Sequence, residues 1–144
     1  MATHPVEASL ELVAERCADL TPFVYDRLFA EYPQMKALFR RDTAAAVQGE
    51  MLARVLEAVL DFVGENRYGA RMIQCEAMTH AGYDLPPQVF RTFFGVVAAG
   101  VREQLGKDWT DEFEQAWRNL LRDLDYFVMH PDQSETDRAT AASV

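Results

Sequence analysis

The sequence predicts an all-α protein in which six to eight helices surround one hydrophobic core. Three observations support this fold class. Apolar residues recur at every third or fourth position along almost the whole chain, whereas no segment shows a convincing alternation of period two. Hydrophobic residues make up 49% of the 144 positions, which is enough for one full core, and the chain is too short for two domains.

The N-terminal half contains three expected helices and one short turn. The first helix covers about residues 7–20. The second begins with Thr21 and Pro22, because threonine is a common N-cap residue and proline is favoured at the first helical position. A turn over residues 33–39 follows, and the third helix covers about 46–64. The third helix has the most regular apolar face, which consists of Gln48, Met51, Leu52, Val55, Leu56, Val59 and Phe62.

The C-terminal half contains at least three more expected helices. Helical spacing continues to His80, and Gly82 is the expected C-terminal stop of that helix. After a break that contains two prolines, one apolar face extends over residues 89–105. The last helix begins at Thr110 with acidic residues in its first turn, as the helix dipole favours, and ends before Pro131.

The domain organisation expected from this pattern is one domain over residues 1–130. The remaining segment, 131–144, is polar and is expected to be a disordered C-terminal tail. No repeat, low-complexity block or inter-domain linker interrupts the helical pattern.

Charge and composition exclude several classes of partner. The formal net charge is −9 and the isoelectric point is near 4.7, so nucleic acids and anionic membrane surfaces are disfavoured. No apolar run approaches the roughly 20 residues that a membrane-spanning helix needs. Cys17 and Cys75 lie at no metal-ligand spacing, and the N-terminus has no signal-peptide pattern, so we expect a cytoplasmic protein with reduced thiols.

Three polar residues fall on otherwise apolar faces: Tyr25, Gln48 and His80. A buried polar group without a partner costs about 1–3 kcal/mol, and an apolar crevice with a few convergent polar groups is the usual form of a cofactor site. Each residue also has an ordinary structural interpretation. His80 can be a cation that stabilises a helix C-terminus, Tyr25 a core aromatic and Gln48 an exposed first-turn residue. The apolar periodicity alone justifies only a helical domain.

Four segments in a fixed order narrow the interpretation. They are VYDRLFAEYPQMKALF, VQGEMLARVLEAVLDFV, MTHAGYDLPPQVF and WTDEFEQAWRNLL. Together they resemble the globin family, and more closely the bacterial single-domain haemoglobins and the globin domains of flavohaemoglobins. The resemblance covers roughly residues 7–130.

The resemblance rests on landmarks in register. Phe39 follows Tyr25 by 14 positions, where the family keeps a phenylalanine against the haem. His80 follows Gln48 by 32 positions, the separation between the family's distal polar residue and its proximal histidine. Trp117 matches the usual tryptophan of the last helix. The implied fold is the globin fold, with its helices around a haem pocket.

The resemblance also implies a role for each candidate residue. His80 would bind the iron of haem b through one ring nitrogen, and Tyr25 and Gln48 would form the distal pair that stabilises bound O2. His4 and His130 lie near the termini, so a second histidine ligand is not expected. The expected haem contacts are Phe39, Leu52, Leu56, His80, Leu85, Phe90 and Phe93.

Two positions depart from the family. Phe90 stands where flavohaemoglobins have a tyrosine that hydrogen-bonds near the proximal histidine, so a peroxidase-like activation is not implied. Glu76 stands where an aliphatic residue is usual. Its carboxylate either bends outward to solvent or supplies a local charge near the haem edge.

The function that the resemblance implies is reversible binding of O2 at pentacoordinate iron, with NO and CO as further ligands. Oxidation of NO to nitrate is a possible enzymatic activity, and because no flavin or nicotinamide domain follows the last helix, it would depend on a separate reductase. The alternatives are a haem-based gas sensor and a haem-free interaction protein, although the haem-free class lacks the proximal histidine. The protein is expected to be a monomer or a homodimer.

Overall fold

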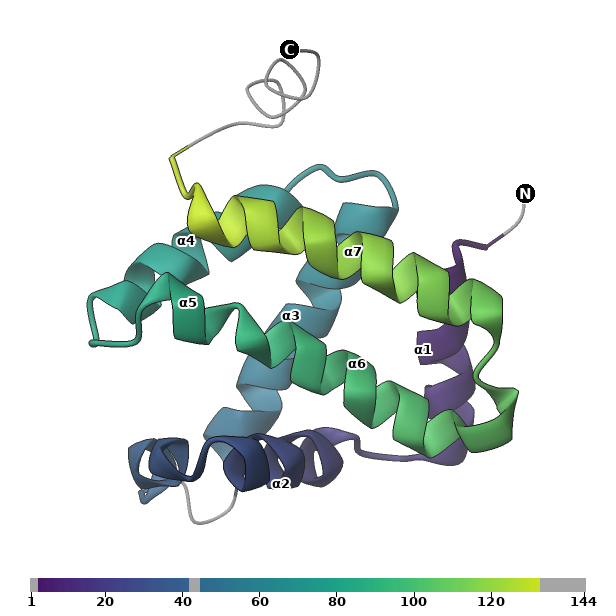
Figure 1. Ribbon diagram of the computed structural model, residues 1–144, viewed down its shortest axis with the longest axis horizontal. Helices are drawn as coiled ribbons and strands as arrows, with labels where there is room; N and C mark the ends of the chain where they lie inside the picture. Colours follow the sequence, from purple (N-terminus) through teal and green to yellow (C-terminus); the bar gives the residue numbers. More distant parts are fainter. Residues whose placement is uncertain (1–2, 42–44, 133–144) are drawn as a thin grey trace.

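The computed structural model describes residues 3–41 and 45–132, and within these ranges every regular element is a helix (Figure 1). The all-α prediction is therefore confirmed. The elements are α1 (Pro5–Arg16), α2 (Thr21–Glu31), the 3-10 helix η1 (Pro33–Phe39), α3 (Ala46–Val63), α4 (Gly69–Ala81), α5 (Pro87–Phe90), α6 (Thr92–Leu105), the 3-10 helix η2 (Gly106–Asp108) and α7 (Asp111–Met129). The part of the expected tail after residue 132 lies outside the described residues. None of the described helices is both long and apolar enough to cross a membrane.

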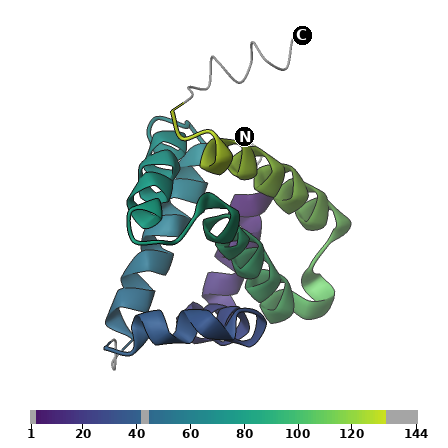
Figure 2. The same cartoon turned by 60° about the vertical axis from the view of Figure 1, so that its left-hand side comes forward.

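The helices pack in crossed pairs around one core. α3 packs against α4, α2 against α6, and both α1 and α4 against α7. Figure 2 shows α4 beside α3 after a turn of 60° about the vertical axis, which agrees with the view in Figure 1. The core contains fully buried side chains from α1, α2, α3, α6 and α7, including Val6, Val24, Val59, Val101 and Phe127.

Local caps explain where several helices begin. The Thr110 side chain accepts a hydrogen bond from the Phe113 N–H at 3.1 Å, so this residue caps α7 as the sequence predicts. At α2 the capping residue differs from the prediction. Thr21 is already helical, and the Asp19 carboxylate accepts its N–H at 3.0 Å. Because the side chain and the backbone of Thr21 both donate to this carboxylate, the pKa of Asp19 lies below its ordinary value.

The start of α4 is joined closely to α3. The N–H groups of Tyr68 and Gly69 both donate to the Asp61 carboxylate of α3, at 2.9 and 2.5 Å. A Cβ atom at Gly69 would lie 2.5 Å from the Ala58 carbonyl oxygen, so only glycine allows this approach. The joint fixes the position of the helix that carries His80.

Two turns in the C-terminal half differ from the expected pattern. The face over 89–105 is not one helix, because Arg91 separates α5 from α6. Gly82 ends α4 as expected, but its φ is −65°, and the left-handed residue of this turn is Asp84, with φ of 64°. The expected C-terminal stop is thus in place, although the glycine there does not use its conformational freedom.

Trp117 of α7 fixes the contact with α1. Its indole N–H donates to the Ser9 hydroxyl at 2.9 Å, and Ser9 donates to the Val6 carbonyl oxygen at 2.7 Å. All three residues are buried, so their polar groups satisfy one another inside the core. The tryptophan that marks the last helix in the sequence therefore has a structural role at this helix contact.

Candidate functional site

A cavity of about 570 Å³ lies between the helices. Its walls come from α2, η1, α3, α4, α5 and α6, together with the turn before α5. Apolar and aromatic side chains dominate the lining, and charged groups come only at its edge among the described residues. A largely apolar cavity of this size with few polar groups is the usual form of a site for a small molecule or cofactor.

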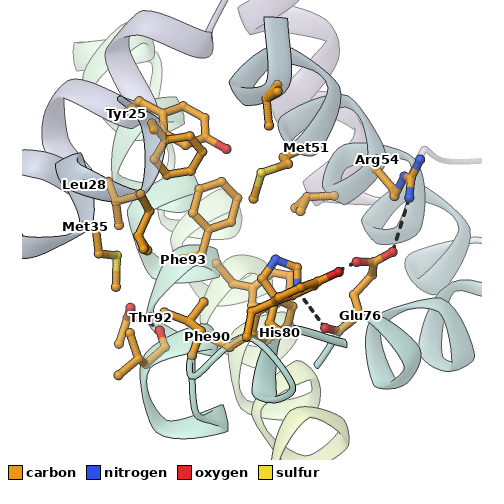
Figure 3. Close-up of a pocket in the computed structure, with 18 of the residues that line it drawn as sticks. Tyr25, Leu28, Met35, Met51, Arg54, Glu76, His80, Phe90, Thr92 and Phe93 are labelled. Carbon is orange, nitrogen blue, oxygen red and sulfur yellow. Dashed lines mark hydrogen bonds and ion pairs between the residues drawn. The ribbon is translucent and has the colours of Figure 1, made fainter. Parts of the chain in front are cut away.

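His80 reaches into this cavity from the last turn of α4 (Figure 3). Its Nδ1 lies 2.7 Å from the carbonyl oxygen of Glu76, one helical turn earlier. A carbonyl oxygen only accepts hydrogen bonds, so in the neutral imidazole Nδ1 carries the hydrogen and Nε2 keeps its lone pair. The Phe90 ring packs on the imidazole, with centroids 4.8 Å apart, and fixes the ring orientation. The arrangement leaves Nε2 as a metal ligand directed away from the helix backbone.

Tyr25 of α2 lines the cavity opposite His80 (Figure 3). The residue is 1% exposed and its ring contacts those of Phe29, Phe39 and Phe93, with centroid distances of 5.9, 5.5 and 5.6 Å. This aromatic cluster holds the phenol ring in one orientation, and Figure 3 shows its oxygen on the side of α3. Tyr25 therefore brings a hydrogen-bond donor into an otherwise apolar part of the cavity.

The face that α3 turns to the cavity differs from the predicted one. The cavity is lined by Val47, Met51, Val55 and Ala58, together with the edge residues of the same helix. Leu52 and Leu56, predicted as haem contacts, instead line a groove between α1 and α3, and Leu52 is only 3% exposed. Gln48, predicted as a distal residue, is half-buried and is not among the residues that line the cavity.

The difference has a simple geometric reason. Successive residues of an α-helix point about 100° apart, so a shift by one residue rotates the selected face by more than a quarter turn. The apolar stripe of α3 is wide enough to include both faces, with Met51 and Val55 on one and Leu52 and Leu56 on the other. Leu52 and Leu56 therefore do not line this cavity, whereas Met51 and Val55 do. Contact of any α3 residue with haem stays a prediction.

The other predicted site residues come together around the cavity. The set comprises Tyr25, Phe39, His80, Leu85, Phe90 and Phe93. They come from α2, η1, α4, the turn before α5, α5 itself and α6. Residues separated by up to 68 positions in the chain thus share one cavity.

The charged partner of Glu76 at the cavity edge is the part that sequence reasoning missed. Arg54 of α3 and Glu76 of α4 both line the cavity, and Arg54 Nη1 lies 3.3 Å from Glu76 Oε1 (Figure 3). The other carboxylate oxygen of Glu76 lies 3.8 Å from His80 Nδ1. Of the two readings left open for Glu76, the structure places the carboxylate beside the cavity, with the side chain 32% exposed. No pattern in the sequence indicated its partner Arg54.

A family model decides the classification. The globin family model matches residues 22–126, which is well over half of the chain and includes both Tyr25 and His80. The chain is a globin. No solved structure matches it with significance.

The residues of this globin fit the cofactor that the family generally binds. Haem iron in globins takes one histidine nitrogen from the protein, and His80 offers one, with the opposite ring nitrogen already engaged. Among residues 3–41 and 45–132, no three His, Cys, Asp or Glu side chains gather in a way that would hold a bare metal ion. One imidazole in an apolar cavity suits an iron that arrives with its own macrocyclic ligands.

Proposed function

We propose that this globin binds haem b through His80 Nε2 and reversibly binds O2 on the side of the haem that faces Tyr25. The observation that carries the proposal is the 2.7 Å contact between His80 Nδ1 and the Glu76 carbonyl oxygen. This contact selects the tautomer and the ring orientation that a proximal ligand needs. The globin family match supports the same function in general terms.

The protein's own residues would then divide the work. Phe90 and the helix backbone hold the imidazole, and the apolar lining excludes water from the cavity. Tyr25 donates a hydrogen bond to a diatomic ligand, since its phenol lies in a part of the cavity where water competes little. When bound, haem supplies the iron that takes up O2, CO or NO. Met51 and Val55 set the space over that ligand from α3.

We further propose that the protein can oxidise NO to nitrate. The overall conversion combines NO, O2 and one electron into one nitrate ion, so each turnover consumes one electron. We propose that an external reductase supplies this electron. The support is the sequence resemblance to bacterial single-domain haemoglobins and flavohaemoglobin globin domains, together with the phenol that faces the cavity.

The first experiment is a haem titration of the purified protein, followed by absorption spectra of the ferric, ferrous, CO-bound and O2-bound forms. We expect stoichiometric binding and a stable oxygenated spectrum in the wild type. His80→Ala should weaken haem binding by roughly 100-fold or more, because even a residue that only orients a metal ligand contributes about 10–100-fold. Added imidazole should partly restore binding.

His130→Ala is the matched control. Its Nδ1 also contacts the carbonyl oxygen one turn earlier, that of Tyr126 at 2.8 Å, but His130 does not line the cavity. The control should bind haem as the wild type does. Equal loss in both variants, or no stoichiometric haem in the wild type, would refute the proposal and favour a haem-free interaction protein. A change of oligomeric state on CO binding would favour the gas sensor.

A further inference from the structure

The ion pair between Arg54 and Glu76 joins the two walls of the cavity at its edge. Arg54 comes from the middle of α3 and Glu76 from α4, and the two side chains meet at 3.3 Å (Figure 3). Arg54 contacts Oε1, whereas Oε2 is the oxygen nearer to His80. The carboxylate thus lies between a solvent-exposed cation and the imidazole.

Glu76 contacts His80 in two separate ways. Its backbone carbonyl oxygen takes the Nδ1 hydrogen at 2.7 Å, while its Oε2 stays 3.8 Å from the same nitrogen. A distance of 3.8 Å is too long for a hydrogen bond, so the carboxylate acts on the imidazole through its charge. The backbone contact is available to any residue at position 76, but the charge depends on the glutamate side chain.

The charged side chains around the cavity decide which charge lies beside His80. Four charged residues line the cavity, namely Arg41, Glu50, Arg54 and Glu76. Of these four, Glu76 places a carboxylate oxygen 3.8 Å from His80 Nδ1. The Arg54 side chain is 61% exposed, against 32% for Glu76, so solvent screens the guanidinium more strongly than the carboxylate. The less screened of the two paired charges is therefore the carboxylate, and its Oε2 lies on the side of His80.

We propose that Glu76 tunes the proximal ligand: its carboxylate, oriented by Arg54, places a negative charge beside His80 and strengthens the imidazole as a donor to haem iron. This inference rests on the proposed haem function and adds a positioning residue to it. A negative charge on the far side of the imidazole stabilises the more positively charged ferric iron relative to ferrous iron. With haem bound, the charge would also strengthen the bond that His80 makes to the iron.

The test is a spectroelectrochemical titration of the haem-loaded full-length protein, in the wild type and in Glu76→Gln. The substitution keeps the shape of the side chain and the backbone carbonyl and removes only the charge. At a fixed applied potential we expect the ratio of ferrous to ferric protein to rise by about threefold, as the loss of one charge in a partly solvated position implies. Resonance Raman spectra of the ferrous protein should show a lower iron–histidine stretching frequency.

Two further variants separate the charge effect from other causes. Glu65→Gln neutralises another glutamate of an exposed ion pair, with Arg67 at 2.7 Å, in the loop between α3 and α4 away from the cavity lining. Glu65→Gln should leave both the ferrous-to-ferric ratio and the stretching frequency unchanged. Glu76→Asp keeps the charge and should retain most of the wild-type behaviour in both measurements.

The outcomes distinguish this inference from the proposed function. Haem binding through His80 with equal ratios and frequencies in Glu76→Gln and Glu65→Gln would overturn the role of Glu76 and leave the haem function intact. A Glu76→Asp variant that matches Glu76→Gln in both measurements would also overturn it. Failure of the wild type to bind haem stoichiometrically would refute the proposed function, and this inference with it.

Discussion

The two walls of the cavity are built on different principles. On the wall formed by α4 and α5, the key contacts lie within one helix or between neighbours, as when His80 bonds the Glu76 carbonyl oxygen one turn earlier. On the wall formed by α2 and α3, the lining depends on how α3 is rotated about its own axis. A contact between positions i and i+4 of a helix follows from spacing alone, whereas the rotation of a helix follows from packing against its neighbours.

The rotation of α3 is set by neighbours on both sides. Leu52 and Leu56 pack towards α1, while Met51 and Val55 face the cavity. α3 begins at Ala46 after the left-handed Ala45, without a side-chain cap to fix its first turn. A wide apolar stripe therefore identifies a helix well. It does not decide which of two adjacent residues in the stripe faces the cavity.

Truncating one side chain on each of the two faces of α3 should give the largest change in stability. Leu52→Ala removes a buried side chain from the contact with α1, so we expect the free energy of unfolding to fall by about 2–5 kcal/mol. Met51→Ala enlarges the cavity instead and should change CO association and dissociation rates with a smaller loss of stability. Denaturant titration of the apo-protein and flash photolysis of the haem-loaded protein measure the two effects.

The opposite result would restore the face expected from the sequence. If Leu52→Ala changes the CO rates and Met51→Ala does not, α3 is rotated by one residue from the position described. Each variant serves as the control of the other, because they truncate adjacent apolar side chains of the same helix.

The sequence predicts the helices better than it predicts the site. The bounds of α3 and α7 follow from apolar periodicity and from the cap at Thr110, both of which are local properties. The break at Arg91 was missed, since the apolar spacing continues across it and no glycine or proline marks it. At the site, Tyr25 and His80 line one cavity, and the resemblance to globins placed them on one pocket. The Arg54–Glu76 pair joins residues of two helices, and that proximity is a product of tertiary packing.

A substitution at Gly69, where the start of α4 meets α3, should give the next largest loss of stability. Gly69→Ala would put a Cβ atom 2.5 Å from the Ala58 carbonyl oxygen and 2.8 Å from the Phe62 nitrogen, both of them rigid backbone atoms of α3. α4 would have to move, and we expect a loss of about 1–3 kcal/mol in the free energy of unfolding. Because α4 carries His80, the haem dissociation rate should rise as well.

Gly95→Ala is the matched control for that substitution. Gly95 lies inside α6, and a Cβ atom there would meet nothing within 4 Å. Alanine is favoured over glycine in a helix interior, so the control should gain roughly 0.5–1 kcal/mol. Destabilisation by both substitutions to the same extent would mean that the approach of α4 to α3 is not what makes Gly69 necessary.

Removing a polar group from the α2–α3 wall should give an effect of intermediate size, on the rate of O2 dissociation. Tyr25 lines the cavity and Gln48 does not, so Tyr25→Phe should raise the O2 dissociation rate by about tenfold, equivalent to roughly 1.4 kcal/mol. Gln48→Leu should change it by less than about threefold, or under roughly 0.7 kcal/mol. Stopped-flow displacement of O2 by CO measures both rates. A larger effect for Gln48→Leu would show that the amide reaches the ligand in the loaded protein.

The smallest expected effect is on the dependence of stability on pH, and it is specific to the contact between α3 and α4. Burial acts to raise the pKa of the Asp61 carboxyl, but the N–H groups of Tyr68 and Gly69 outweigh it and hold this pKa below its ordinary value of about 3.9. A carboxylate with a lowered pKa in the folded state stabilises the protein above about pH 4 and loses that contribution as the pH falls through the folded value. Asp61→Asn should therefore be less stable at neutral pH and should vary less in stability between about pH 5 and pH 2.

Asp19→Asn separates the effect on α4 from a general loss of acid stability. Asp19 also has a lowered pKa, through its hydrogen bonds with Thr21, but it serves the start of α2. Both variants should lose stability at neutral pH, as followed by thermal unfolding. Only Asp61→Asn should also release haem faster, because Asp61 anchors the first turn of the helix that presents His80, and a helix loosened at its start holds its last turn less firmly. Equal haem release from both variants would mean that the α3–α4 joint contributes to folding without positioning the proximal histidine.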